Sequence, residues 1–584
     1  MKHDNIDKSY PRPQLVRDNY KILDGSWDFM FDYENVGEDN KWYTEFPKER
    51  EKIIVPFSYQ TKLSGIGDKT FCPHIWYHKE VDYSNDYIAK KRLLLNIDGC
   101  DYLTKIWVNG RFIGEHKGGY TRITFDITDA VIKNNKKANI VVKATDTKNT
   151  DQLRGKQQWK DGPFACFYDE TNGIWKSVWS EFVDKTQILF LMITPNYESK
   201  TCNIKFFIDN FKENLKVRLK ISYKGRVLVD KIRDLPINAH NIKTKIRDIY
   251  FYPWDVDNPE LYDVEITLLK GNQTVDKVYT YFGFRSIMTD EDKIFFNNEP
   301  IYLSMVLYQG YHKDSGLTAP SYDALYKDIE IAKELGFNGI RMHQKIEDER
   351  FYHIADILGM LIWCEMPSAY DYTENTAEEI KRDFFEVLYQ YYNYPSIIAW
   401  VPFNESWGVP EVKTNIEQQC LTTLASVNAK RIDSTRLVIS NDGWQHTISD
   451  IITLHNYSQD AGEFRKLLSN IKDKMKENFF EPEVPFADNF GYFNEPIMIS
   501  EFAGIGYKNG KEDGWGYGDK VNSSDQFVER LSSLVKVIRD NKDICGFCVT
   551  QLTDVYQEIN GLLDMDRKPK AEIRKLQKAI RGEL

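Results

Sequence analysis

The 584-residue chain has no long apolar run and only eight cysteines. A membrane-spanning helix needs about 18 or more apolar residues in a row, and no stretch comes near that length, so no membrane partner is expected. The cysteines lack the spacing of a disulfide framework, and the lone CxxC of Cys545 and Cys548 lies in an apolar run, which favours buried thiols over metal or redox chemistry. The N-terminal residues also lack the apolar core of a secretory signal. These absences predict a cytoplasmic protein.

The chain is also short of positive charge, with 77 basic against 88 acidic residues and a net charge of -11. A nucleic-acid partner requires a basic face, so none is expected. Aromatic residues are by contrast abundant, at 14% of the chain. Aromatic rings stack on sugars, but they are also common in β-sandwich cores, and the second explanation accounts for most of the excess.

The first half of the chain is rich in short runs typical of β-strands, punctuated by Asn, Asp and Gly turns. No helical periodicity separates these runs before residue 310. A new set of strands begins near Lys185 and continues to Ile287, a length typical of an immunoglobulin-like sandwich. We therefore predict one β domain over residues 1–185 and a second over 186–287.

The second half alternates between apolar strand-like runs and amphipathic helical segments. Eight strands in about 290 residues have the size and rhythm of a (β/α)8 barrel, which we predict over residues 288–584. A doubly wound sheet is the alternative, but no glycine-rich phosphate loop follows the first strand. The predicted strands are 301–307, 337–343, 360–366, 397–405, 436–442, 451–457, 496–502 and 544–552.

Polar residues gather at the carboxyl ends of these strands, where barrel active sites lie. Any one of them is equally well explained as a structural ion pair, but burying a whole ring of them is costly without a polar ligand. The ring comprises Arg341, His343, Glu365, Asn404, Glu405, His455, Asn456, Tyr457, Glu501 and the segment 551–554.

Glu405 and Glu501 each follow an apolar strand and are the main catalytic candidates. Glycoside cleavage needs one carboxyl group to protonate the leaving oxygen and a second to act at the anomeric carbon; retaining enzymes place the two about 5–5.5 Å apart and inverting enzymes about 6.5–9.5 Å apart. Metal chemistry is the competing hypothesis, but His343 and His455 lie in no HxxE, HxH or HExxH motif. A serine nucleophile is disfavoured because no GxSxG is present.

The segments around both glutamates resemble glycoside hydrolase family 2. NYPSIIAWVPFNESWG (393–408) is similar to the acid/base signature of that family and places the acid/base at Glu405; IMISEFAG (497–504) is similar to the nucleophile segment and places the nucleophile at Glu501. Residues 107–128 and 172–179 resemble its sugar-binding jelly roll, 282–285 the end of its immunoglobulin-like domain, and 566–570 the close of its barrel. The resemblance implies a jelly roll, an Ig-like β-sandwich and a TIM barrel. It also implies exo-acting hydrolysis of β-glycosides with retention of the anomeric configuration and without an organic cofactor.

Two departures from the family pattern concern the barrel. Trp400 is followed by Val401 where members often have Gly or Ser, and His343 is followed by Gln344-Lys345 rather than Tyr-Pro. The magnesium and sodium contacts of the larger lactose-cleaving members are therefore not carried over, and no metal is predicted.

The sugar is predicted from the segment before the DRKPK stretch. β-Glucuronidases of the family resemble one another there in an Asn-x-Lys clamp on the uronate, whereas this chain has Glu558-Ile559-Asn560, whose carboxylate would repel another. We therefore predict a β-galactosidase-like enzyme for neutral terminal sugars. The alternatives are a β-glucuronidase, an α-L-arabinopyranosidase or a β-mannosidase, and, in a different class, a non-catalytic carbohydrate-binding protein, which is expected to have lost one of the glutamates.

Further residues are predicted to contact the carbohydrate substrate. Asn404 is expected at the 2-hydroxyl, and Arg341 and Tyr457 are expected to orient Glu501. Structural packing is an equal alternative for His343 and His455, as is loop anchoring for Trp515, a candidate aglycone platform. Glu558 and Asn560 complete the substrate-binding set, and segment 154–159 is a candidate for reaching the barrel from the first domain. A homodimer is expected only on base rates.

Overall fold

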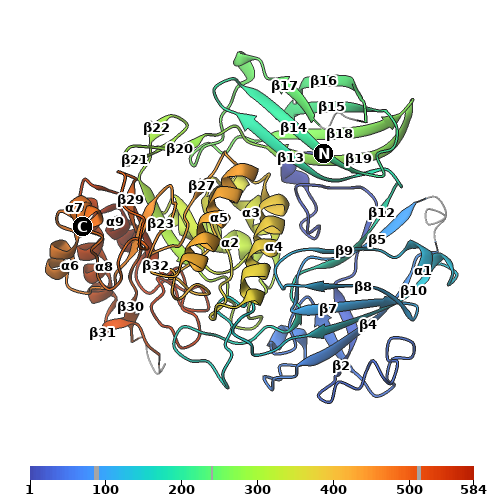
Figure 1. Ribbon diagram of the computed structural model, residues 1–584, viewed down its shortest axis with the longest axis horizontal. Coiled ribbons are helices and arrows are strands. Elements are labelled where there is room, and N and C mark those ends of the chain that lie inside the picture. The colour runs from blue at the N-terminus through green and yellow to red at the C-terminus, as the bar shows by residue number, and fades with distance from the viewer. Residues whose placement is uncertain (85–90, 238–240, 509–513) are drawn as a thin grey trace.

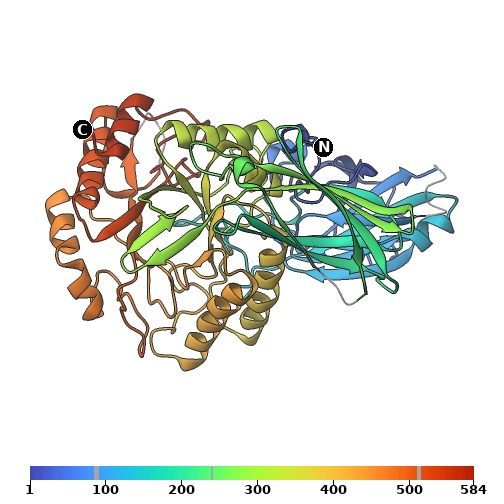
Figure 2. The same cartoon turned by 90° about the horizontal axis from the view of Figure 1, so that it is seen from above.

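The computed structural model describes residues 1–84, 91–237, 241–508 and 514–584. It contains two β-sandwiches and a barrel, each with a hydrophobic cluster of its own. Figure 1 shows the blue N-terminal sandwich and the green middle sandwich on one side of the barrel, which runs from yellow to red, and Figure 2 shows the same arrangement from above. No helix in the described part of the chain is long and apolar enough to cross a membrane.

The N-terminal domain packs two antiparallel sheets face to face. Alternation along strands such as β3, where Ile53 and Val55 point inward, supplies the core between the sheets. A single turn of helix, α1 (Thr128–Ile132), interrupts the β-structure that the sequence predicts throughout. The sheets are β1 (Tyr20–Ile22), β12 (Val178–Val183), β5 (Arg92–Ile97) and β9 (Ile123–Asp126), and β3 (Glu51–Val55), β2 (Gly25–Phe31), β4 (His74–Asp82), β10 (Lys137–Thr145), β7 (Leu103–Val108) and β8 (Arg111–Lys117).

The middle domain is an immunoglobulin-like sandwich of three strands on four. In β15 (Leu215–Tyr223), Leu215, Val217, Leu219 and Ile221 alternate with charged residues and fill its core. The other strands are β13 (Gln187–Asn196), β14 (Thr201–Asp209) and β17 (Asn241–Lys245) in one sheet, and β16 (Arg226–Leu235), β18 (Tyr262–Lys270) and β19 (Gln273–Phe282) in the other. A small sheet of β20 (Ile287–Asp290), β21 (Lys293–Phe296) and β22 (Glu299–Pro300) leads into the barrel.

The barrel is an eight-stranded parallel sheet in the order β27, β26, β25, β24, β23, β32, β29, β28. Its strands are buried on both faces, which is why they read as continuous apolar runs. In the described residues, no strand pairing closes the seam between β27 and β28. The strands are β23 (Leu303–Tyr308), β24 (Gly339–Met342), β25 (Leu361–Glu365), β26 (Ile397–Val401), β27 (Leu437–Val438), β28 (Ile452–His455), β29 (Ile497–Ala503) and β32 (Ile544–Thr550).

Helices cover the outside of the barrel and turn their apolar faces to the strands. Side-chain caps set several of their starts: Ser321, Asp348, Thr373 and Ser523 each accept a hydrogen bond from a backbone N–H of the first turn. The helices are α2 (Tyr322–Glu334), α3 (Glu349–Leu358), α4 (Glu374–Tyr391), α5 (Ile416–Ile432), α6 (Ala461–Leu468), α7 (Ile471–Lys476), α8 (Ser524–Arg539) and α9 (Ile573–Arg581).

Two predicted strands end well before the expected residue, and both differences shape the site. β26 ends at Val401 because Pro402 has no N–H to continue the ladder, so Glu405 lies in the following loop rather than at the strand end. β27 keeps only Leu437–Val438 of the predicted 436–442. The remaining residues of that run, including Asp442, form a loop beside the open seam.

One segment of the N-terminal domain lies directly against the barrel. After β10, the teal chain of Figure 1 runs toward the barrel, where the backbone N–H groups of Arg154 and Gly155 donate to Ser368 O at 3.1 and 3.0 Å. Gly155 adopts a φ of +60°, and a Cβ at this position would lie 2.4 Å from Gln344 O. Only glycine allows this backbone conformation and this approach together.

Candidate active site

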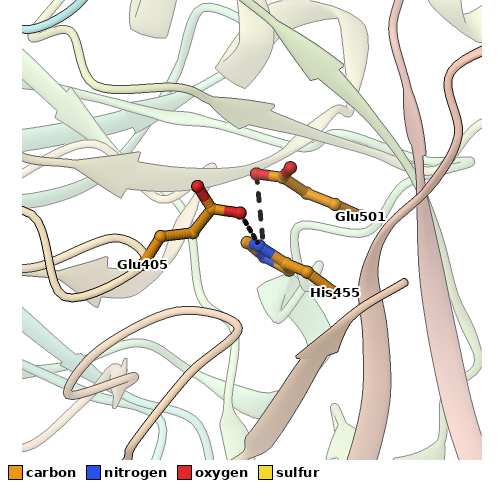
Figure 3. Close-up of side chains that lie close together, drawn as sticks. All are labelled: Glu405, His455 and Glu501. Atoms are coloured by element: carbon orange, nitrogen blue, oxygen red, sulfur yellow. Dashed lines mark hydrogen bonds and ion pairs between the residues drawn. The ribbon is translucent and has the colours of Figure 1, made fainter. Parts of the chain in front are cut away.

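Glu405 and Glu501 meet at the carboxyl end of the barrel. One oxygen of each carboxylate and a ring nitrogen of His455 all lie within 4.8 Å of one another. Figure 3 shows both carboxyl groups next to the imidazole, each joined to it by a dashed line. This separation is close to the ~5–5.5 Å of retaining glycosidases and shorter than the ~6.5–9.5 Å of inverting ones.

The loop that carries Glu405 has an unusual backbone. Glu405 and Ser406 have φ values of +49° and +57°, a left-handed conformation that costs side-chain-bearing residues about 1–3 kcal/mol each. Hydrogen bonds from Glu405 N to Asp442 O and from Ser406 N to Asn441 Oδ1, both 2.9 Å, hold the turn. The indole of Trp407 donates to Glu405 Oε2 at 3.2 Å. The loop beside the barrel seam therefore fixes the position of this carboxylate.

Glu501 is held by Arg341 and Tyr457. Arg341 Nη1 donates to Oε1 at 2.8 Å, and the Tyr457 hydroxyl donates to Oε2. Arg341 is fully buried and also ion-pairs with Glu365 at 2.7 Å and Asp442 at 2.8 Å. Burial would lower the pKa of Arg341, but these carboxylates raise it well above its ordinary value. The guanidinium is thus a permanent cation that orients the nucleophile candidate.

His455 bridges the two candidates. Its Nδ1 lies 2.7 Å from Glu405 Oε1, and its Nε2 lies 3.6 Å from Glu501 and 3.4 Å from Asp442. Burial disfavours the charged imidazole, yet the surrounding carboxylates raise the pKa of His455 to about 10. Burial raises the pKa of Glu405, but the hydrogen bond and charge of His455, the charge of Lys156 and the hydrogen bond from Trp407 together leave that pKa below its ordinary value. At neutral pH the shared proton therefore lies on His455, one hydrogen bond from Glu405.

Among the described residues, the side chains of Glu405, His455 and Glu501 are also close enough together to hold a metal ion. A histidine ligand must be uncharged to bind a cation, so a metal ion here would have to displace the proton of His455, whose pKa is raised to about 10. Without such an ion, the imidazolium supplies the positive charge between the carboxylates.

Two more predicted residues, His343 and Asn404, lie beside this centre. His343 Nδ1 is 3.1 Å from Arg341 Nη2 and 4.0 Å from Glu501. Burial, with the charges of Lys156 and Arg341, lowers the pKa of His343 well below its ordinary value, so its imidazole is neutral. Asn404 Oδ1 accepts from Arg341 at 2.7 Å, while its buried Nδ2 has no partner in the described residues. That amide keeps a donor available for a ligand.

Glu558 and Asn560 lie in a buried chain of hydrogen bonds that reaches the N-terminal domain. Asn560 Nδ2 donates to Glu558 Oε1 at 2.9 Å, and Gln551 donates to Asn560 Oδ1 at 2.8 Å. Tyr168, from the N-terminal domain, donates to Glu558 Oε2. Trp515 is half-buried, and its indole donates to Ala165 O at 2.9 Å. These predicted contacts therefore lie where the two domains meet.

Several residues of the site were missed from the sequence. Asp442 could have been found, because it ends the predicted strand 436–442. The aromatic cluster next to Glu405 comes from loops of two domains, and its only signal was the aromatic-rich segment 159–168. Its ring pairs are Trp159–Tyr370 at 4.4 Å, Phe167–Tyr370 at 4.9 Å, Tyr370–Trp407 at 5.2 Å and Trp407–Trp444 at 6.4 Å between centroids.

Comparison with known families gives three matches in order along the chain. The sugar binding domain of glycosyl hydrolases family 2 matches residues 20–178, the family 2 domain that follows it matches 186–285, and the family 2 TIM barrel domain matches 287–582.

The similar proteins carry more than one activity in their names. A putative β-glucuronidase of Formosa agariphila is 28% identical over 62% of this chain and 44% of its own length. A β-glucuronidase of Bacteroides fragilis is 24% identical over 80% of this chain and 68% of its own length. A β-galactosidase of Thermoanaerobacter pseudethanolicus is 26% identical over 57% of this chain and 44% of its own length. The chain thus spans less than half the length of two of these relatives. The structure of Ruminococcus gnavus β-glucuronidase with D-glucuronic acid has the same fold, with a TM-score of 0.80, 20% identity and coverage of 97% of this chain and 99% of that one.

Proposed function

The chain belongs to glycosyl hydrolase family 2, and from this premise we propose that it is a retaining, exo-acting β-glycosidase with Glu501 as nucleophile and Glu405 as acid/base. The observation that carries the proposal is the approach of the two carboxylates to within 4.8 Å at the carboxyl end of the barrel. That spacing suits direct attack by one carboxylate and leaves little room for a water between them.

The reaction proceeds in two steps. Glu501 attacks the anomeric carbon while the bond to the leaving oxygen breaks and Glu405 gives that oxygen a proton; an ester between the sugar and Glu501 results. Glu405 then takes a proton from water, the water oxygen attacks the anomeric carbon, and the ester bond to Glu501 breaks. Arg341 and Tyr457 hold Glu501 in line, and the free Nδ2 of Asn404 is available to the 2-hydroxyl.

His455 supplies the proton for the first step. The proton on Nδ1 reaches Glu405 Oε1 along the 2.7 Å hydrogen bond, so Glu405 acts as an acid although its own pKa is lowered. The high pKa of His455 keeps this proton in place across the neutral range.

We propose a neutral terminal sugar, in the manner of a β-galactosidase. Glu558 supports this, because a carboxylate stands where uronate-cleaving members resemble one another in an Asn-x-Lys clamp, and both its oxygens are bound within a buried network. A β-glucuronidase is the second candidate, favoured by the names of the Formosa and Bacteroides relatives.

Nitrophenyl glycosides test the proposal with wild type, Glu405→Gln and Glu501→Gln. General acid–base catalysis contributes about 10²–10⁴-fold, so Glu405→Gln should lose that much on unactivated substrates, with azide restoring turnover of an activated one as the β-glycosyl azide. Glu501→Gln should lose at least as much and show no such rescue. NMR should show the β-anomer released first. Equal turnover by all three proteins, or release of the α-anomer, would refute the mechanism, and the ranking of galactoside, glucuronide, mannoside and arabinoside decides the sugar.

A further inference from the structure

Lys156 belongs to the N-terminal domain, yet its side chain is buried at the barrel site. It follows Gly155 in the segment held against the barrel, and the residue is only 8% exposed. Its ammonium lies 5.5 Å from the ring centroid of Phe167, and that ring lies 6.5 Å from Trp407, the indole that donates to Glu405. The side chain therefore lies against an aromatic ring that faces the acid/base loop.

The ammonium of Lys156 has a single, weak acceptor among the described residues. This is the thiol of Cys166, with 3.4 Å between Nζ and Sγ. Within the same part of the chain no carboxylate lies at ion-pair distance from Lys156. An ammonium has three N–H donors, and burying a charge without partners is costly.

Other buried lysines of the protein are satisfied by oxygen atoms. Lys176 donates to Tyr120 O, Glu347 O and the Tyr391 hydroxyl at 3.3–3.4 Å. Lys345 donates to Gly310 O and Leu317 O at 2.8 and 2.7 Å and also to Glu347. Of these three lysines, only Lys156 has ammonium N–H groups without an acceptor in the described residues. This difference suggests a role in binding a ligand rather than in stabilising the fold.

The charge of Lys156 acts on the reacting groups. Burial raises the pKa values of Glu405 and Glu558 and lowers that of His343, and the charge of Lys156 lowers all three; the pKa of Glu558 nevertheless stays above its ordinary value. Conversely, burial would lower the pKa of Lys156, but Cys166 and the three glutamates around it raise that pKa above its ordinary value. The ammonium is thus charged, and it lies near enough to Glu405 and Glu501 for their charges to raise its pKa.

We propose that Lys156 is a substrate-binding residue whose ammonium donates hydrogen bonds to a hydroxyl oxygen of the terminal sugar. The inference rests on the proposed glycosidase function and deepens it, because it assigns part of the sugar recognition to the N-terminal domain. A hydroxyl suits the site better than a carboxylate, because the carboxylates of the site outnumber its cations even when Arg341 and His455 are counted with Lys156. A uronate would add more negative charge. The terminal sugar that Lys156 selects is therefore uncharged.

Deoxy sugars test the proposal directly. kcat/KM would be measured for wild type, Lys156→Met and the control Lys160→Met, an exposed lysine of the same segment, on the best neutral nitrophenyl glycoside and on its 3-deoxy, 4-deoxy and 6-deoxy analogues. A hydrogen bond from a charged donor is worth about 1.5–3 kcal/mol, so Lys156→Met should lose about 10- to 100-fold on the parent sugar, with Lys160→Met within twofold of wild type. The loss should vanish for the one analogue that lacks the bonded hydroxyl.

Three outcomes overturn the inference: wild-type rates for Lys156→Met, an equal loss on every analogue, or a loss confined to glucuronide. If Lys156→Met does not fold, Lys156→Arg serves instead, because it keeps the charge but moves the donors and should show the same analogue-dependent loss. Failure of the proposed function is distinguishable, since in that case wild type itself hydrolyses none of the glycosides.

Discussion

Arg341, on the barrel side of the site, is bound on each of its three guanidinium nitrogens, whereas Lys156, on the N-terminal side, donates to one thiol in the described structure. The first cation is placed before any substrate arrives, and electrostatic groups fixed in this way need no reorganisation during the reaction. The second cation completes its hydrogen bonds only with a ligand. The barrel is thus built for the chemical step, and the N-terminal segment is built for recognition.

Replacing Arg341, on the barrel side of the site, should cause the largest loss of activity and stability. Arg341→Met leaves Glu365, Asp442 and Glu501 without their shared cation, and breaking a buried ion pair in this way costs about 3–5 kcal/mol. kcat should fall by about 10²–10³-fold, and the thermal midpoint should fall by several degrees. Steady-state kinetics and calorimetry check this against Arg431→Met, an exposed position of α5. A kcat within tenfold of wild type would contradict the role of Arg341.

Removing the Tyr457 hydroxyl should have a smaller effect of the same kind. Tyr457→Phe deletes one of two donors to Glu501 but leaves Arg341 in place. Loss of a hydrogen bond to a charged group predicts a decrease in kcat of about 10- to 100-fold with KM little changed. The rate at which a 2-deoxy-2-fluoro glycoside traps Glu501 measures the step concerned. A change in KM alone would place Tyr457 with the recognition residues instead.

The pH dependence of stability should report on His455. Its pKa is raised from 6.5 to about 10 in the folded protein, so the stabilisation from the charged imidazole is complete below pH 6.5 and is lost as the pH rises through about 10. Between pH 7 and 10 the thermal midpoint of wild type should therefore fall more steeply than that of His455→Asn. Parallel midpoint curves for the two proteins would show that His455 is not charged in the fold.

Lys156→Met should leave stability almost unchanged, which is the smallest effect expected. Unlike Arg341, the ammonium has no ion-pair partner in the described part of the chain, and its removal leaves no buried carboxylate newly unpaired at contact distance. The thermal midpoint should stay within about 1 °C of wild type, a shift that corresponds to roughly 1 kcal/mol in a chain of this size. If the thermal midpoint of Lys156→Met fell as far as that of Arg341→Met, Lys156 would have a structural role like that of Arg341. The contrast between the two cations would then be wrong.

The contrast also explains what could be predicted from the sequence. Strand ends follow a regular pattern, so the apolar runs before Glu501 and Arg341 were enough to place both residues at the barrel mouth. Glu405 lies beside Glu501 as expected from the pattern, although Pro402 ends the strand early and leaves Glu405 in a loop; its catalytic role stays a prediction. Its bridge to His455 depends on two loops and a strand, and no spacing in the sequence encodes it.

Residues contributed across the domain boundary were harder to predict. Segment 154–159 was a candidate for reaching the barrel, but nothing singled out Lys156, because its importance depends on burial and on the charges of glutamates more than 200 residues away. Glu558 and Asn560 were expected to contact substrate, and the structure shows their polar atoms bonded to Gln551 and Tyr168. Whether they also contact the sugar stays a prediction, as do the domain limits at 185 and 287.

Gly155 limits how this protein could be recombined with its relatives. Its missing side chain lets two backbones touch, and Lys156 is the next residue, so the spacing between the domains and the reach of the ammonium are set at one point. A chimaera that joins this barrel to a foreign N-terminal module would need both the glycine and the length of the segment around it. An alanine at position 155 would push the segment away from the barrel and move Lys156 out of the site, although every residue of the barrel would be native.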